Sequence, residues 1–110
     1  MAYKVVITES AYQDVDDILA YIVVRAGNVA PARSFLDRWS SMVEALSRFP
    51  EMHPLNHLSE LSRLGYRSFV TGKYVTLYRY DDKDVYIVHV FHGSRDYARF
   101  VMQGENNSGR

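Results

Sequence analysis

Four side chains that suit RNA cleavage fall in the last 44 residues of this 110-residue chain: Arg67, His92, Arg95 and Tyr97. Metal-free RNA cleavage needs a base for the 2′-hydroxyl proton, a cation for the pentavalent phosphate and an acid for the leaving oxygen. His92 suits proton transfer because the ordinary pKa of histidine lies near neutrality. These residues are candidates for a nuclease site. A plainer interpretation is that His92 and Arg95 tie the end of a strand to Asp96.

Other chemistries find little support in the sequence. The chain has no cysteine, which excludes disulfides, thiolate metal sites and cysteine nucleophiles. It contains no phosphate-binding loop, dinucleotide fingerprint, HExxH or GxSxG motif. His53 and His57 have the spacing of metal ligands on a helix, but Pro54 separates them and no third ligand follows nearby. We therefore expect no metal and no cofactor, and any enzymatic activity would be that of a metal-independent endoribonuclease.

The charges balance but are unevenly distributed. The 13 basic and 13 acidic residues give zero net charge, which argues against direct, sequence-specific DNA binding. The first predicted helix is acidic, whereas residues 61–80 carry four basic side chains and no acidic one. This basic segment is either an ordinary solvated strand edge or a functional patch. Neither a signal peptide nor a membrane span is visible, so we expect a cytoplasmic protein without a membrane partner.

Three runs rich in β-branched and aromatic residues must position the candidate side chains. They predict strands at residues 65–71, 73–80 and 84–92, joined as an antiparallel meander. Gly72 suits the first tight turn and the charged residues 81–84 suit the second. Alternation places Val75 and Leu77 on one face of the middle strand, opposite its tyrosines. In the last strand, alternation predicts one face of Val85, Ile87, His89 and Phe91, and another of Tyr86, Val88, Val90 and His92. Because both faces are largely apolar, this strand is predicted to be central.

The rest of the chain predicts elements that cover this sheet. Residues 3–8 read as a strand, followed by a helix capped by Ser10 with Gln13 and ended by Gly27. A second amphipathic helix, capped by Asn28, runs to Pro50 and carries Trp39 as a core anchor. These helices predict an antiparallel hairpin on the sheet. Residues 51–63 predict a crossover with one helical turn, and residues after Asp96 predict a last turn. We expect one domain at 1–103 and a disordered tail at 104–110.

The order of these elements resembles the RelE/ParE superfamily of bacterial toxins. The resemblance spans about residues 3–101 and rests on four segments in the same order: AYQDVDDILAYI, LSRFPEMHP, LGYRSFVTGKYVTLYRY and VYIVHVFHGSRDY. It implies an α+β fold in which an N-terminal strand and an antiparallel helix hairpin pack on a small antiparallel sheet. It also implies the toxin component of a type II toxin–antitoxin module.

The stretch GYRSFVTGKYVTLYRY followed by VHVFH resembles the ParE branch. That branch implies a toxin that inhibits DNA gyrase through protein–protein contact and is neutralised by a ParD-like antitoxin. The RelE-like nucleases keep basic residues at positions where this chain has Val75 and Phe69, leaving Arg67 and Arg95 as counterparts. For target or antitoxin binding we predict a set on the sheet and its exit: Arg67, Lys73, Tyr74, Tyr78, His92 and Arg95.

Two alternatives remain open at this stage. The first is a RelE-like, ribosome-dependent mRNA endonuclease that uses the four candidate residues, with the ribosome and mRNA as partners. The second is a degenerate member that binds an antitoxin without being toxic. Fold alone does not decide between these functions.

Overall fold

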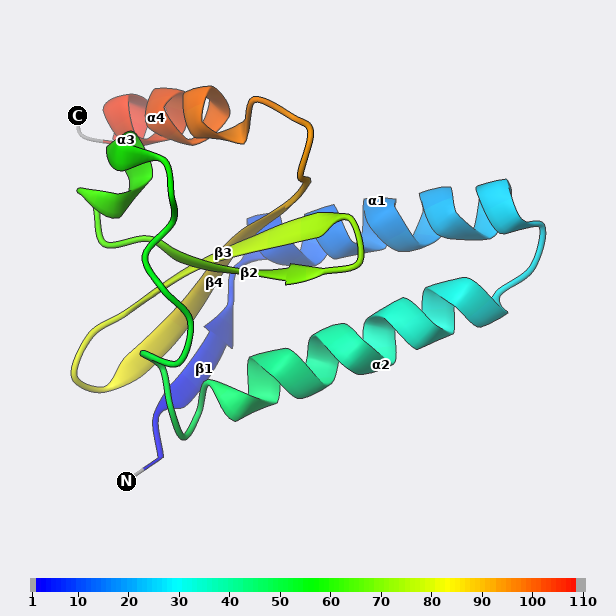
Figure 1. The fold of residues 1–110 in the computed structure, drawn as a ribbon, viewed down its shortest axis with the longest axis horizontal. Coiled ribbons are helices and arrows are strands. Elements are labelled where there is room, and N and C mark those ends of the chain that lie inside the picture. The colour runs from blue at the N-terminus through cyan, green and yellow to red at the C-terminus, as the bar shows by residue number, and fades with distance from the viewer. Residues whose placement is uncertain (1, 109–110) are drawn as a thin grey trace.

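The computed structural model describes residues 2–108, with side chains described as far as Gly104. Two layers of helices enclose one four-stranded sheet (Figure 1). The α1–α2 hairpin covers one face of the sheet, and α3 with α4 covers the other. None of the described helices is long and apolar enough to cross a membrane. The elements in chain order are β1 (Lys4–Ile7), α1 (Glu9–Ala26), α2 (Ala30–Ala45), α3 (Ser59–Ser62), β2 (Arg67–Thr71), β3 (Tyr74–Tyr80), β4 (Asp84–His92) and α4 (Tyr97–Ser108).

The sheet has the strand order β1-β4-β3-β2. Strands β2, β3 and β4 form the predicted antiparallel meander, and β4 lies between β1 and β3, as its apolar faces predicted. Strand β1 pairs with β4 in parallel, so the sheet is mixed and not purely antiparallel. A parallel pair requires a long connection, which the helix hairpin, α3, β2 and β3 provide between β1 and β4. The α+β class predicted from the sequence is confirmed.

Both predicted turns of the meander are present. Gly72 takes the left-handed conformation, with φ of 61°, which a side chain would strain. In the second turn, the Oδ1 atom of Asp81 accepts hydrogen bonds of 2.8 Å from the amides of Lys83 and Asp84. These bonds favour the ionised carboxylate and lower the pKa of Asp81. A carboxylate that organises its own turn explains why four charged residues fit there.

The helix ends agree with the sequence in part. Gly27 ends α1 in the left-handed conformation, and its amide donates to the carbonyl of Val23. The predicted Ser10 cap is wrong: Thr8 is the N-cap, since its hydroxyl oxygen accepts from the amide of Ala11. Ser10 is the second residue of α1, so it lies inside the helix and not at the position before it that caps it. Helix α2 ends at Ala45, five residues before Pro50, because residues 46–48 form a separate turn.

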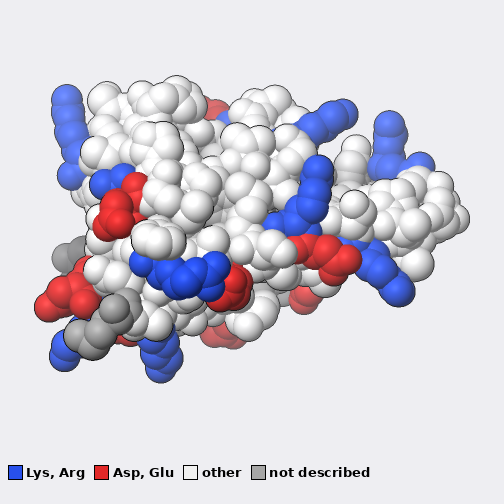
Figure 2. All heavy atoms as spheres, turned by 60° about the horizontal axis from the view of Figure 1, so that its bottom comes forward, with Lys and Arg blue, Asp and Glu red and all other residues white. Residues whose placement is uncertain are grey.

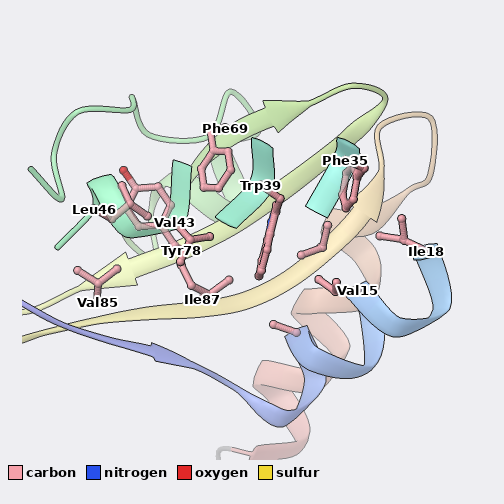
Figure 3. Packing of buried hydrophobic residues seen from close by; sticks show 12 residues of the cluster. Val15, Ile18, Phe35, Trp39, Val43, Leu46, Phe69, Tyr78, Val85 and Ile87 are labelled. Carbon is pink, nitrogen blue, oxygen red and sulfur yellow. The ribbon is translucent and has the colours of Figure 1, made fainter. Parts of the chain in front are cut away.

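The hairpin-side core is the larger apolar cluster, between the α1–α2 hairpin and the sheet (Figure 3). Trp39 is its centre, and its indole N–H donates a 2.9 Å hydrogen bond to the buried hydroxyl of Thr76 on β3. The bond gives the indole nitrogen the partner that a buried polar group requires. The buried members of the hairpin-side core are Ala11, Val15, Ile18, Phe35, Trp39, Val43, Leu46, Phe69, Tyr78, Val85, Ile87 and Val90.

The outer core is a second cluster on the opposite face of the sheet. It packs α3, α4 and the segment before β2 against β3 and β4. Helix α4 is longer than the single turn predicted, and it takes in residues 104–108 of the segment expected to be a disordered tail. Residues 109 and 110 lie outside the described residues. The buried members of the outer core are Leu61, Tyr66, Leu77, Phe91, Tyr97, Ala98 and Val101.

A β-bulge at Val88 makes the predicted faces of β4 wrong. Leu77 pairs with His89 and Tyr78 pairs with Ile87, so Val88 has no partner residue on β3. An extra residue shifts the alternation by one position. Consequently Ile87 and Val90 both belong to the hairpin-side core, while Phe91 belongs to the outer core. The apolar run hid the bulge, since either phase of alternation places suitable residues on both faces.

Candidate functional site

A cleft of about 300 Å³ opens between α1 and the C-terminal end of β4, and we call it the α1 cleft. Helix α1 contributes one wall, made of two carboxylates, an aliphatic and an aromatic side chain: Asp14, Asp17, Ile18 and Tyr21. The opposite wall combines Tyr74 of β3, the end of β4 and the loop that follows it, including His92 and Arg95. The volume lies at the small end of the range for ligand pockets.

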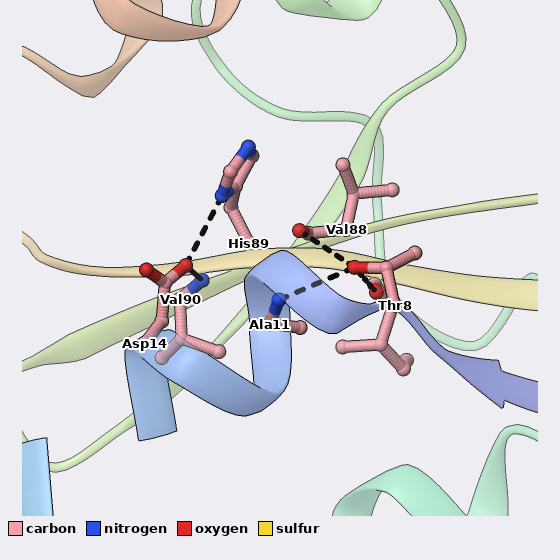
Figure 4. A network of polar contacts seen from close by, with 7 residues as sticks. Thr8, Ala11, Asp14, Val88, His89 and Val90 are labelled. Atoms are coloured by element: carbon pink, nitrogen blue, oxygen red, sulfur yellow. Dashed lines mark hydrogen bonds and ion pairs between the residues drawn. The ribbon is translucent and has the colours of Figure 1, made fainter. Parts of the chain in front are cut away.

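A polar network fixes α1 beside β4 at the start of this cleft (Figure 4). Strand β1 ends at Ile7, so beyond this point the edge of β4 meets α1 instead of a strand. The Thr8 hydroxyl lies 2.9 and 3.1 Å from the carbonyl oxygens of Ile87 and Val88. The Oδ2 atom of Asp14 accepts from the Val90 amide at 2.9 Å. The side chains of Thr8, the N-cap residue, and of Asp14 in α1 therefore bond main-chain groups of β4 around the bulge.

Asp14 also holds the imidazole of His89. Its Oδ2 atom lies 3.1 Å from His89 Nδ1, and both side chains are largely buried. The ring of His89 stacks on Phe91 with centroids 5.0 Å apart, and Phe100 meets it edge-on. Asp14 of α1 thus contacts His89, and His89 contacts Phe91 of β4 and Phe100 of α4. These contacts couple the position of α1 to that of the end of β4.

His92 and Arg95, both predicted site residues, line the same cleft. The Nδ1 atom of His92 accepts from the Ser94 amide at 3.1 Å, and the Ser94 hydroxyl oxygen lies 2.7 Å away. Because a backbone amide can only donate, a neutral His92 ring carries its proton on Nε2. The guanidinium of Arg95 lies 5.1 Å and 4.9 Å from the ring centroids of Phe91 and Phe100.

Arg67 lies away from this pair, whereas Tyr97 is next to Arg95 but its hydroxyl is bonded to Asn56. On β3, Arg67 is opposite Tyr78 and His92 is opposite Tyr74, a separation of about 13 Å along the strand. The Arg67 guanidinium donates to the carbonyl of His53 at 2.7 Å. Tyr97 is 4% exposed, and its hydroxyl accepts from the Asn56 side-chain amide at 3.2 Å. The structure therefore joins His92 and Arg95, places Arg67 toward the other end of the sheet, and buries the hydroxyl of Tyr97.

The remaining predicted binding residues differ in accessibility. Lys73 is exposed in the β2–β3 turn, and its carbonyl accepts from the Gly93 amide next to the cleft. Tyr74 is partly buried against Phe35. Burial raises its pKa most, and the nearby Tyr21 raises it further. Tyr78 is fully buried, and its hydroxyl donates to the Pro50 carbonyl at 2.7 Å. Burial raises the pKa of Tyr78 to about 12, and no partner surface can reach its side chain directly.

The acidic and aromatic wall of the cleft was missed in the sequence. Asp14, Asp17 and Tyr21 are spaced three and four residues apart, so they lie along one side of α1. This spacing was the available signal, but the sequence suggested only a generally acidic helix. Their place beside β4 depends on the bulge and the Thr8 cap, which periodicity does not reveal.

The described part of the chain contains no group of three or more His, Cys, Asp or Glu side chains arranged to hold a metal. The ring of His53 packs on Phe69 with centroids 5.0 Å apart, and burial lowers its pKa.

Figure 2 shows basic and acidic side chains interspersed over the face that carries α2. No broad field of one sign covers that face.

Comparison with known proteins identifies the family. The family described as "ParE toxin of type II toxin-antitoxin system, parDE" matches residues 5–97. The chain belongs to the ParE toxin family. The match runs from the second residue of β1 to the first residue of α4 and therefore includes both walls of the α1 cleft. A search of curated proteins finds no match.

Solved structures agree with this membership. A chain of the chromosomal ParDE toxin–antitoxin system from P. aeruginosa superposes with a TM-score of 0.68 at 17% identity, covering 83% of this chain and 96% of its own. A chain of the RelBE2 toxin–antitoxin complex from Mycobacterium tuberculosis gives a TM-score of 0.52 at 25% identity, covering 84% and 99%. The likeness to the P. aeruginosa chain concerns the fold. The ParE-family chain thus has the architecture of proteins solved in toxin–antitoxin systems.

Proposed function

We propose that this ParE-family toxin acts by binding DNA gyrase and is neutralised by a ParD-like antitoxin. The observation that carries the proposal is that the reactive groups of Arg67 and Tyr97 do not converge with those of His92 and Arg95. An RNA-cleaving site needs its base, acid and cation within hydrogen-bond reach of one phosphate. Arg67 bonds to a loop carbonyl at the far end of the sheet, and the hydroxyl of Tyr97 is buried. A toxin that acts by binding needs no such convergence.

Exposed apolar surface on the helix hairpin supports an antitoxin partner. A groove of about 250 Å³ between α1 and α2 is lined almost entirely by apolar atoms. Val24 and Val29 near the hairpin tip are 79% and 56% exposed. An amphipathic segment that folds on binding covers surface of this kind, and such tails wrap large areas of their partners.

The antitoxin part of the proposal is tested by co-expression with the gene next to that of the toxin. The complex should remain intact in gel filtration. Val29→Asp should weaken it by placing a charge in the hairpin groove. Val70→Asp is the control, because Val70 is 60% exposed on β2, away from the groove. Separate elution of the two proteins would contradict an antitoxin partnership with that gene product.

The gyrase part is tested with purified proteins. The toxin should inhibit DNA supercoiling by gyrase, and added antitoxin should restore it. Unchanged supercoiling at a large excess of folded toxin would contradict gyrase as the target. If the toxin also fails to arrest growth when expressed alone, the degenerate, antitoxin-binding alternative accounts for the result.

The nuclease alternative retains one favourable observation. His92 and Arg95 are both exposed and line the same cleft, so a proton-transfer group and a cation stand together. Cleavage of mRNA on programmed ribosomes by purified toxin would support this alternative. Loss of that cleavage in His92→Gln would assign it to the cleft.

A further inference from the structure

Within the described part of the chain, β4 has a short edge inside the α1 cleft beside which no strand lies. The Gly93 amide donates to the Lys73 carbonyl, so residues 91 and 93 direct their main-chain groups toward β3. In an antiparallel pair the intervening residues direct theirs outward. The Val90 amide confirms this direction by donating to Asp14. The carbonyl of Val90 and the amide of His92 therefore point into the cleft, in line with β1 but beyond its end at Ile7.

The side chains around this edge suit an extended peptide. Ile18, Tyr21 and Tyr74 offer apolar surface, and Tyr21 is 55% exposed. The α1 wall also carries negative charge. Asp14 is occupied by two donors of its own chain, whereas Asp17 is exposed and, among the described residues, its Oδ1 atom accepts from the Gln13 side chain. Arg95 lies over Phe91 and lines the same cleft from the wall opposite α1.

We propose that the antitoxin adds an extended segment to the sheet as a short strand beside β4, bonded to the Val90 carbonyl and the His92 amide. This inference rests on the proposed neutralisation by an antitoxin and names where and how a segment binds. The segment directs an apolar side chain toward Ile18 and Tyr21 and a basic side chain toward Asp17. Main-chain bonds to the edge provide affinity, and the alternating pockets provide selectivity, as in other cases of strand addition.

The chain offers matched pairs of variants on α1. Asp17→Lys reverses the charge of the cleft wall, and Asp16→Lys makes the same change at a neighbouring exposed residue that does not line the cleft. Tyr21→Ala removes an aromatic anchor. Tyr12→Ala is its control, since Tyr12 is similarly exposed, at 58%, and lies outside the cleft. All four positions are exposed, so thermal melts should show folded variants.

Binding of the neighbouring gene product to purified toxin variants provides the first measurement. Asp17→Lys and Tyr21→Ala should each raise the dissociation constant at least about tenfold, the scale of interface anchors. Asp16→Lys and Tyr12→Ala should stay within about twofold of the unmodified toxin. Equal effects within each pair would overturn the proposal.

Amide hydrogen exchange, followed by NMR in the free toxin and in the complex, provides the second measurement. The His92 amide should exchange at least about 100-fold more slowly in the complex, because strand addition bonds it. The Val70 amide is the matched control, since the antiparallel pattern also directs it outward, on the β2 edge. Protection of Val70 without His92 would place the added strand on β2 and overturn the proposal. A stable complex with His92 unprotected would overturn this inference and leave antitoxin binding intact, whereas the absence of any complex would overturn both.

Discussion

The two sides of the sheet are built in different ways. The hairpin-side core is covered by helices of 18 and 16 residues, each with a regular apolar stripe. The outer core is covered by a four-residue helix, the segment before β2 and the last helix of the chain. Long, continuous helices resist local opening more than a four-residue helix and an irregular segment do. The hairpin side should therefore set global stability, and the outer side should open first.

Removing Trp39 should have the largest effect. Trp39→Ala leaves a cavity in the hairpin-side core and removes the donor that satisfies the buried Thr76 hydroxyl. We expect a loss of about 3–5 kcal/mol in unfolding free energy. Urea denaturation measures this loss, and a value under about 1 kcal/mol would show that α2 packs differently.

A matched pair of leucines compares the two cores directly. Leu46 and Leu61 are both completely buried, the first in the hairpin-side core and the second in the outer core. Leucine-to-alanine changes cost about 2–5 kcal/mol, and less where the surroundings relax into the cavity. Leu61→Ala should fall in the lower half of that range and Leu46→Ala in the upper half. A larger loss of unfolding free energy for Leu61→Ala than for Leu46→Ala in denaturation experiments would contradict the proposed difference between the two cores.

Tyr78 predicts a loss of stability at high pH. Its pKa is raised from 10 to about 12 in the folded protein, so above pH 10 the unfolded state loses the proton more readily. The contribution is complete below pH 10 and is lost as the pH rises toward 12. A shift of about two units corresponds to a contribution on the order of 2–3 kcal/mol. Tyr78→Phe should reduce the fall in unfolding free energy between pH 10 and 12, and an identical fall would contradict the assignment.

Tyr97 should have the smallest effect. Tyr97→Phe keeps the ring stacked on Phe91 and removes the hydroxyl that accepts from Asn56. The Asn56 amide keeps its bond to the Ser68 hydroxyl, so the loss should be about 0.5–1.5 kcal/mol. Because Tyr97 was also a nuclease candidate, growth arrest by this variant is informative. Unchanged toxicity is expected, and abolished toxicity in a stable variant would give its hydroxyl a functional role.

The sequence predicted the elements that carry a strong local pattern. The meander, its Gly72 turn, the α1 end at Gly27 and the buried stripe of α2 all follow from periodicity and turn chemistry. The Val88 bulge did not follow, because an apolar run satisfies either phase of alternation. The degree of burial did not follow from the sequence either. Alternation assigns Tyr78 to one face of β3, but only the packing of the helix hairpin on that face makes it fully buried.

The candidate site was predictable only where its residues are close in sequence. His92 and Arg95 lie together because they follow the same strand. Arg67 lies toward the other end of β3 from His92, because it is opposite Tyr78 and His92 is opposite Tyr74. The assignment of residues to strands does not by itself give this pairing register. Predicting the α1 wall of the cleft would have required knowing that α1 packs beside the edge of β4. Contacts between residues far apart in the sequence, such as Asp14 with Val90, determine that packing.

Growth arrest by His92→Gln tests most directly the claim that the toxin acts by binding. Glutamine keeps a hydrogen-bonding group of similar size and removes proton transfer near neutral pH. Toxicity should stay within a few-fold of the unmodified toxin, and purified His92→Gln should still inhibit supercoiling by gyrase. A nuclease that lost its acid or base would slow by about 10²–10⁴-fold. Loss of growth arrest, together with mRNA cuts on programmed ribosomes that disappear in this variant, would contradict the account.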